Sequence, residues 1–195
     1  MNLDHFTWIN PPNTWEISRD KLTFTTEPET DFWQRTYYGF RNDNAPAFLL
    51  PVKEQSFTFS VRTAWVYQTL FDQCGIILYQ DSDNWCKASV EYDNPSFSRL
   101  GSVVTNLGYS DWATTDVDSD ITHMAYRLSR RGPDFLLENA LDGKPFQQMR
   151  IFHMHTPLEV VRIGVYACSP LQSSFNVEVT DFNLGQCVWE AHHLD

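Results

Sequence analysis

Apolar and polar residues alternate along most of the chain, and clusters of Asp, Asn, Gly and Pro interrupt the pattern at short intervals. Alternation with a period of two is typical of β-strands, and helical periodicity is nearly absent. The pattern predicts strands at residues 14–18, 21–26, 35–41, 56–66, 73–80, 84–92, 101–106, 123–130, 134–140, 146–154, 160–168 and 174–184. About a dozen strands without helical crossovers predict an all-β fold, a jelly-roll β-sandwich of two antiparallel sheets.

The length and charge of the chain narrow this picture. We expect one β-sandwich domain over residues 1–195, because no Gly-, Ser- or Pro-rich linker and no internal repeat divides the sequence. Lys and Arg number 14 against 25 Asp and Glu, which gives a formal net charge of −11. An acidic surface repels phosphate backbones and anionic lipids, so we expect neither nucleic acid nor membrane as a partner.

The apolar runs and the cysteines indicate a cytoplasmic protein. The first twelve residues contain Asp4 and two prolines where a secretory signal has a basic start and an apolar stretch. Other apolar runs fall far short of the ~20 residues that cross a bilayer. The four cysteines, Cys74, Cys86, Cys168 and Cys187, form no C-x-x-C pair. We therefore expect four reduced thiols.

The predicted hairpin at residues 71–92 has a second strand with two chemically different faces. Trp85, Lys87, Ser89 and Glu91 share one face, and Cys86, Ala88, Val90 and Tyr92 share the other. The small apolar set is expected to face the core, and the polar set a surface or cleft. If Tyr79 pairs with Trp85, Gln73 lies opposite Glu91, whereas a slip of one residue would separate them.

Several short motifs, in this order, resemble a known family: DFWQRTYYGF at 31–40, FDQCG at 71–75, NWCKASVEY at 84–92, VVTN at 103–106, YSDW at 109–112, ALDG at 140–143 and YACSP at 166–170. Together they resemble the domain of unknown function 1349, the family of regulation-of-enolase-like proteins. The resemblance implies a cytosolic β-sandwich similar to concanavalin A-like lectins and glucanases. It also implies a metabolic enzyme as a partner, but no settled activity.

A carbohydrate site needs aromatic platforms and planar polar groups, and the 73–92 hairpin with a loop at 105–112 supplies both. The candidate ligand-binding residues are Gln73, Trp85, Lys87, Glu91, Asn106, Tyr109, Asp111, Trp112 and Arg127. We expect Trp85 and Trp112 to stack on a sugar and Arg127 to pair with Glu91. The alternative is structural: both tryptophans cap the sandwich edge, and the polar residues bond to turns or form ion pairs.

Hydrolysis of a glycoside would need two carboxylates at a defined separation. Glu91-Tyr92-Asp93 begins like the strand signature of sandwich glucanases, but the second glutamate is missing, since positions 95 and 96 are Pro and Ser. Glu138 or Glu178 would have to complete a pair. The sequence therefore favours binding of a carbohydrate or sugar-derived molecule without hydrolysis. Two alternatives stay open: a protein-interaction module, and an isomerase or lyase that uses Lys87 and Glu91 as acid and base.

No metal or cofactor is expected. Asp116, Asp118 and Asp120 alternate as in a calcium loop, but Ile121 and Arg127 stand where an EF-hand needs Gly and Glu. His153 and His155 share a strand face without an evident third ligand, and His192 and His193 belong to a solvated tail. The sequence also has no phosphate-cradling glycine loop and no nucleophile motif.

Overall fold

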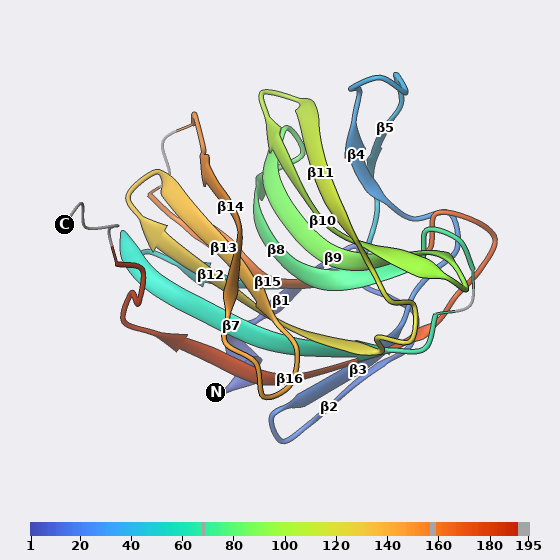
Figure 1. Ribbon diagram of the computed structural model, residues 1–195. Coiled ribbons are helices and arrows are strands. Elements are labelled where there is room, and N and C mark those ends of the chain that lie inside the picture. Colours follow the sequence, from blue (N-terminus) through green and yellow to red (C-terminus); the bar gives the residue numbers. More distant parts are fainter. Residues whose placement is uncertain (68, 157–158, 191–195) are drawn as a thin grey trace.

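The computed structural model describes residues 1–67, 69–156 and 159–190, and it consists of two seven-stranded antiparallel sheets packed face to face (Figure 1). In order, sheet A contains β1 (Thr7–Ile9), β6 (Ala47–Val52), β15 (Val161–Cys168), β8 (Gln73–Asp81), β9 (Asn84–Asn94), β10 (Phe97–Asn106) and β11 (Tyr109–Val117). Sheet B contains β14 (Gln147–His153), β13 (Asp134–Ala140), β12 (His123–Arg131), β7 (Ser56–Trp65), β16 (Asn176–Gly185), β3 (Lys21–Thr25) and β2 (Trp15–Ser18). The predicted β-sandwich of two antiparallel sheets is confirmed.

The main core fills the space between the sheets. It combines small residues of β9, such as Ala88 and Val90, with large ones from sheet B, such as Phe59 and Phe135, all of them buried. Side chains alternate between the two faces of a strand, so every second residue enters this core. The outer face of sheet A, turned away from sheet B, is left for other contacts.

A second apolar cluster covers part of that outer face. Residues 27–46, which we call the cover segment, run across it and include the short hairpin of β4 (Phe32–Gln34) and β5 (Arg41–Asp43) (Figure 1). Phe32 of this segment packs among Tyr79, Trp85 and Tyr166 of sheet A. The middle of sheet A is therefore buried on both faces, whereas an antiparallel sheet commonly has one face in contact with solvent.

The hairpin of β8 and β9 has the first of the two registers that the sequence leaves open. Tyr79 pairs with Trp85, and Gln73 lies opposite Glu91. The small apolar set of β9 faces the core between the sheets, and the polar set lies on the outer face. The four cysteines are free. Among the described residues, no helix is long and apolar enough to cross a membrane.

The strand prediction was wrong at several places. Of the strand expected at 35–41, residues 35–40 form the turn between β4 and β5, where Arg35, Tyr37 and Gly39 have positive φ angles. β6 was missed because it lies buried on both faces and does not alternate. β11, expected as a loop, is an edge strand with mostly exposed residues. The short strands β1, β4 and β5 were also missed, and β10 begins at Phe97, not at residue 101.

Close strand packing in sheet A gives a stability prediction at Gly75. A Cβ atom there would lie 1.8 Å from the carbonyl oxygen of Ala88, so Gly75→Ala must push β8 and β9 apart. We expect a loss of about 2–3 kcal/mol in the free energy of unfolding. Gly185→Ala is the matched control, since its Cβ meets nothing closer than 4.0 Å. Chemical denaturation checks both variants, and equal stability of the two would contradict the packing described.

Candidate functional site

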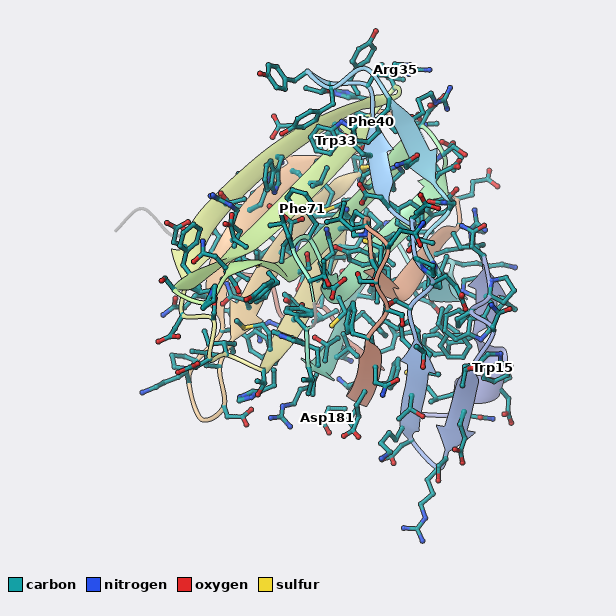
Figure 2. The ribbon with its side chains drawn as sticks, turned by 90° about the vertical axis from the view of Figure 1, so that its right-hand side faces the viewer. Trp15, Trp33, Arg35, Phe40, Phe71 and Asp181 are labelled. Carbon is teal, nitrogen blue, oxygen red and sulfur yellow. The ribbon has the colours of Figure 1, made fainter. Side chains whose placement is uncertain are left out.

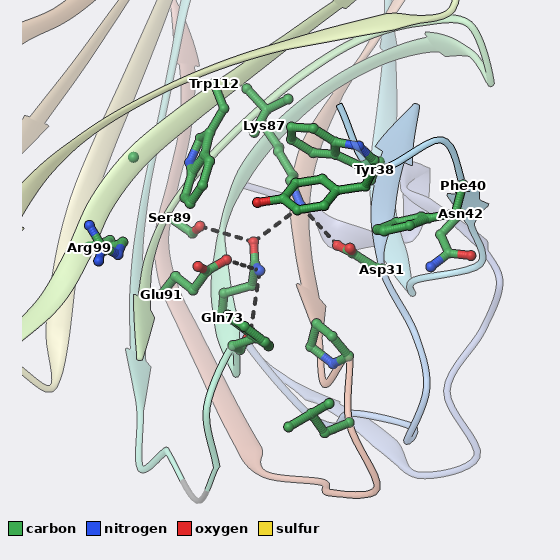
Figure 3. Close-up of a pocket in the computed structure, with 16 residues that line it drawn as sticks. Asp31, Tyr38, Phe40, Asn42, Gln73, Lys87, Ser89, Glu91, Arg99 and Trp112 are labelled. Carbon is green, nitrogen blue, oxygen red and sulfur yellow. Dashed lines mark hydrogen bonds and ion pairs between the residues drawn. The ribbon is translucent and has the colours of Figure 1, made fainter. Parts of the chain in front are cut away.

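A pocket of about 400 Å³ lies on the outer face of sheet A, beside the cover segment (Figure 3). Such a volume is within the range of small-molecule sites in proteins. Sixteen residues line it: Asp31, Trp33, Tyr38, Phe40, Asn42, Phe71, Gln73, Lys87, Ser89, Glu91, Arg99, Gly101, Val103, Trp112, Pro170 and Leu171. They come from the cover segment, from β8 to β11, and from the loops before β8 and after β15. Most of the pocket is thus built on rigid strands.

The floor of the pocket holds a buried ion pair. Lys87 is only 4% exposed, and its Nζ lies 3.1 Å from Asp31 Oδ1. Burial by itself would lower the pKa of Lys87, but the negative charge of Asp31, with smaller effects of Cys168 and Glu91, raises the pKa above its ordinary value. A buried ammonium is tolerated only when it is paired in this way. The Lys87–Asp31 pair therefore joins β9 to the cover segment.

The amide of Gln73 connects the charged groups of the floor. Its oxygen accepts hydrogen bonds from Lys87 Nζ (3.2 Å), Ser89 Oγ (3.3 Å) and Tyr166 OH (2.9 Å). Its nitrogen donates to Phe71 O (3.2 Å) and Glu91 Oε2 (2.6 Å). Three donors around the oxygen and two acceptors around the nitrogen fix which way the amide points. Gln73 thus holds Lys87 at one end and Glu91 at the other, as the dashed lines in Figure 3 show.

Glu91 contributes a carboxyl group with a raised pKa to the pocket. Burial raises its pKa from 4.5 to about 7, against the lowering effects of Lys87 and Arg99, and Asp31 adds to the rise. The two cations lower the pKa only in part, because each has another partner. Lys87 pairs with Asp31, and Arg99 Nε lies 2.8 Å from Asp93 Oδ2. Among the described residues, Glu91 Oε1 makes no hydrogen bond, so this oxygen is available to a ligand.

Aromatic side chains form the walls. Trp112, 41% exposed, packs edge-on against Trp33 at 6.4 Å between ring centroids, and Tyr38 does the same at 5.5 Å. Trp112 can lie against the sheet because position 101 is glycine: a Cβ there would come within 3.0 Å of Trp112 Nε1. In Figure 3, Trp112 stands on one side of the polar floor, and Tyr38 and Phe40 on the other. The pocket is therefore polar below and aromatic at its sides.

The structure brings together four of the nine predicted ligand-binding residues. Gln73, Lys87, Glu91 and Trp112 line the pocket. Trp85 shares their strand face, but it is 0% exposed and packs against Phe32, with its indole N–H donating to Ser82 O. The expected stacking of a ligand on Trp85 was wrong, because the cover segment occupies that position. Trp85 lies beside the floor under the cover segment, with its ring centroid 6.0 Å from Lys87 Nζ.

The expected pairing of Arg127 with Glu91 was also wrong. Arg127 lies on β12 in the other sheet and forms a bidentate ion pair with Glu138, at 2.6 and 2.7 Å. Glu178, the other acid considered, lies on β16 of the same sheet and pairs with Lys21 at 3.2 Å. Neither glutamate lines the pocket. The partner of Glu91 is instead Gln73, directly opposite on β8.

Three further candidates lie around the turn between β10 and β11, outside the pocket. Asn106 donates a hydrogen bond to the backbone of His153 at 3.0 Å, and Asp111 forms an ion pair with Arg150 at 3.0 Å. Tyr109 lies beneath the guanidinium of Arg35, 5.6 Å from the ring centroid. These contacts connect sheet edges and the cover segment. The predicted cleft loop at 105–112 is thus a hairpin with structural contacts.

The residues considered as metal ligands have other partners. Asp116 forms an ion pair with Arg99 at 3.5 Å, and the Asp118 carboxylate accepts a hydrogen bond from the backbone of Asp120. His153 Nδ1 lies 2.7 Å from Asp134. In the part of the chain that is described, no three His, Cys, Asp or Glu side chains are grouped to hold a metal ion. His192 and His193 lie outside the described residues.

Sequence reasoning missed the contribution of the cover segment. Asp31, Trp33, Tyr38, Phe40 and Asn42 all line the pocket. The one signal was the density of aromatic residues in this stretch, which was interpreted as a strand. The alternation of residues within a segment does not reveal that the segment crosses the outer face of a sheet whose strands come from distant parts of the sequence.

A comparison of the chain with protein-family models identifies its family. The two packed antiparallel sheets define a β-sandwich. The family model described as "Protein of unknown function (DUF1349)" matches residues 8–187. The chain therefore belongs to the DUF1349 family, as its motifs had suggested.

Relatives and solved structures extend this result. Regulation of enolase protein 1 of Saccharomyces cerevisiae is 30% identical over 191 residues, which cover 98% of this chain and 94% of the relative. A crystal structure described as a functionally unknown protein from Saccharomyces cerevisiae matches with a TM-score of 0.89 and 27% identity, covering 97% of this chain and all of that one. The GH43 BlXynB protein from Bacillus licheniformis matches with a TM-score of 0.70 and 11% identity, over 93% of this chain and 37% of that chain. The last likeness shows the fold alone.

The state of Glu91 gives a testable pH dependence. Because its pKa is raised in the folded protein, the carboxyl favours folding fully below pH 4.5, and this contribution is lost as the pH rises to about 7. In ¹³C NMR we expect the Glu91 carboxyl, assigned by its absence in Glu91→Gln, to titrate near 7. Arg99→Gln should raise that pKa further, since Arg99 lowers it.

Lys21→Gln provides the control, because Lys21 pairs with Glu178 on the other sheet. It should leave the Glu91 titration unchanged. A midpoint near 4.5 in the wild type would contradict the burial described.

Proposed function

We propose that this chain, as a cytoplasmic protein, binds a sugar or a sugar-derived small molecule in the pocket over Gln73, without hydrolysing it. The observation that carries the proposal is the combination of aromatic walls with a prearranged polar floor. Trp112, Tyr38 and Phe40 offer ring faces for the C–H surfaces of a sugar ring. Beneath them, Glu91 Oε1 and the ammonium of Lys87 offer an acceptor and a donor for hydroxyl groups.

The hydrogen-bond count supports a ligand in contact with the floor. An ammonium has three N–H donors, and Lys87 uses two of them, on Asp31 and Gln73. The third N–H has no hydrogen-bond partner among the described residues, although Nζ lies 5.3 Å from the centroid of the Tyr166 ring. Lys87 lines the pocket, so a ligand hydroxyl can accept from this N–H. This N–H of Lys87 is a donor and Glu91 Oε1 is an acceptor, and the Gln73 amide bonds to both residues. Neighbouring hydroxyls of a sugar present the same combination of groups.

Absence of hydrolysis is supported by the state of the second carboxyl in the pocket. Asp31 is the only other carboxyl among the lining residues, and its Oδ1 is bound to Lys87 and to the backbone N–H of Phe32. A glycosidase needs both carboxyls placed across the scissile bond, one of them as proton donor. Here the second one serves as the counter-ion of a buried lysine.

Binding should depend on Trp112 and not on an equally exposed tryptophan elsewhere. Trp15, 47% exposed, lies on β2 of sheet B and packs against Trp8 as Trp112 packs against Trp33. Figure 2 shows Trp15 far from Trp33 and Phe40. In a thermal-shift screen with neutral sugars, sugar acids and sugar phosphates, a ligand of the native state raises Tm.

We expect Trp112→Ala to remove at least about 1.5 kcal/mol of binding free energy, a roughly tenfold weaker Kd, and Trp15→Ala to leave Kd unchanged. Titration calorimetry measures both. Equal affinity of the two variants would place the ligand elsewhere.

A second candidate function is regulation of a metabolic enzyme, which the name of the yeast relative suggests. The turn of the cover segment carries three exposed aromatic residues: Tyr37, 93% exposed, Tyr38 and Phe40. Exposed aromatic residues of this kind are enriched where proteins bind one another. The enzyme to test is enolase.

Sedimentation velocity with purified enolase checks this second candidate. We expect a complex that Tyr37→Ser weakens at least tenfold, while Leu107→Ser, a change at an exposed residue of the β10–β11 turn, has no effect. Independent sedimentation of the two proteins would rule out direct regulation of enolase.

A further inference from the structure

Of the charged groups around the pocket, Lys87 and Arg99 have ion-pair partners and Glu91 has none among the described residues. Lys87 is matched by Asp31, and Arg99 by Asp93 and Asp116, at 2.8 and 3.5 Å. Glu91 is left without an ion-pair partner among the described residues, and it is bound only by the neutral amide of Gln73. If the Glu91 carboxylate served only to accept hydrogen bonds from a ligand, a paired cation would stabilise its charged form. Carboxyl groups set apart from their counter-ions in a pocket are typical of acid–base chemistry.

We propose that the pocket, if it binds sugars as proposed above, isomerises the open-chain form of an aldose, with Glu91 as the base and Lys87 as the group that holds the carbonyl oxygen. Both residues face the same pocket through uncommitted atoms, Oε1 of Glu91 and one N–H of Lys87. Gln73 bonds to both and fixes their separation. Such preorganisation lets a charge that develops on the substrate be met without rearrangement of the protein.

The reaction balances without a further reactant. Glu91 Oε1 takes the proton from C2 of the aldose, the C2–H electron pair forms the C1–C2 double bond, and the carbonyl electrons move onto O1. Lys87 gives a proton to O1 and receives the proton of the C2 hydroxyl. Glu91 then returns its proton to C1, and C2 becomes the carbonyl carbon of the ketose. Both residues end in their starting states, and no oxidant or reductant is consumed.

The surroundings of Glu91 suit this role near neutral pH. The groups that act on it are Lys87, Asp31, Arg99 and the amide of Gln73. Together with burial they bring its pKa to about 7, where the acid and the base form are both populated. General acid–base catalysis is most effective when the pKa lies close to the working pH. The pocket volume of about 400 Å³ also admits a single sugar unit.

The test is solvent exchange in D₂O, followed by ¹H NMR, with D-xylose and D-glucose as probes. If the proton on Glu91 exchanges with solvent before it is returned, deuterium appears in the sugar. If it does not, the ketose forms with the original proton at C1, so the spectra follow both signals. We expect the wild type to remove the C2–H signal of the probe that raises Tm and to form the ketose. The rate at saturating sugar should rise with pH through about 7, as Glu91 becomes the base.

Glu91→Gln is the decisive variant, because it keeps the size of the side chain and removes the base. We expect exchange at saturating sugar to fall at least about a hundredfold. Glu178→Gln, on the outer face of sheet B, is the matched control and should keep the full rate. The Tm of each free variant shows whether it is folded.

The outcomes separate the two proposals. A probe that raises Tm but neither exchanges its C2 proton nor forms the ketose overturns the isomerase and leaves sugar binding intact. Equal exchange by the wild type and Glu91→Gln also overturns it. If neither probe raises Tm or exchanges, the isomerase of these aldoses is overturned, and binding of sugars then rests on the wider ligand screen.

Discussion

The buried ion pair between Lys87 and Asp31 is the interaction on which the site depends. Lys87 stands in the middle of a strand whose neighbours are buried on both faces. A lone ammonium in that position would cost several kcal/mol, so a carboxylate must reach it. Asp31 does so from the cover segment, and Phe32, the next residue, enters the aromatic cluster on the same face. The pair and the cluster together hold the cover segment on sheet A and so create the pocket between them.

The proposed function rests on this site, not on the sandwich. The same architecture occurs as 37% of the chain of a GH43 protein with 11% identity. One fold can host many functions, so the fold alone does not define the function. The proposal rests on the polar floor, in which a single amide carries five hydrogen bonds and links an ion pair to a carboxyl with a raised pKa. That arrangement is fixed before any ligand arrives. It is the reason to expect a small-molecule site.

The sequence predicted the fold and one strand face of the site. It did not predict the contacts between segments far apart in the chain, for physical reasons. Alternation along β9 placed Lys87 and Glu91 on one face. It left two hairpin registers open, and the structure has the one with Gln73 opposite Glu91. The first conclusion rests on local periodicity, which the structure keeps. Trp85 satisfied the same periodicity, but its burial depends on Phe32, more than fifty positions away. Asp31 escaped notice because long-range pairing leaves no periodic trace in the chain. Arg127 belongs to the other sheet, which local patterns do not reveal either.

The central claim is that the pocket over Gln73 holds a sugar-derived ligand, and a crystal structure with a sugar that raises Tm tests it most directly. We predict electron density for the ligand between Trp112 and Tyr38, with hydroxyl oxygens within hydrogen-bond distance of Lys87 Nζ and Glu91 Oε1. The amide of Gln73 should keep the orientation seen without ligand. Density for the sugar at any other place on the molecule, with the pocket filled by water alone, would contradict the account.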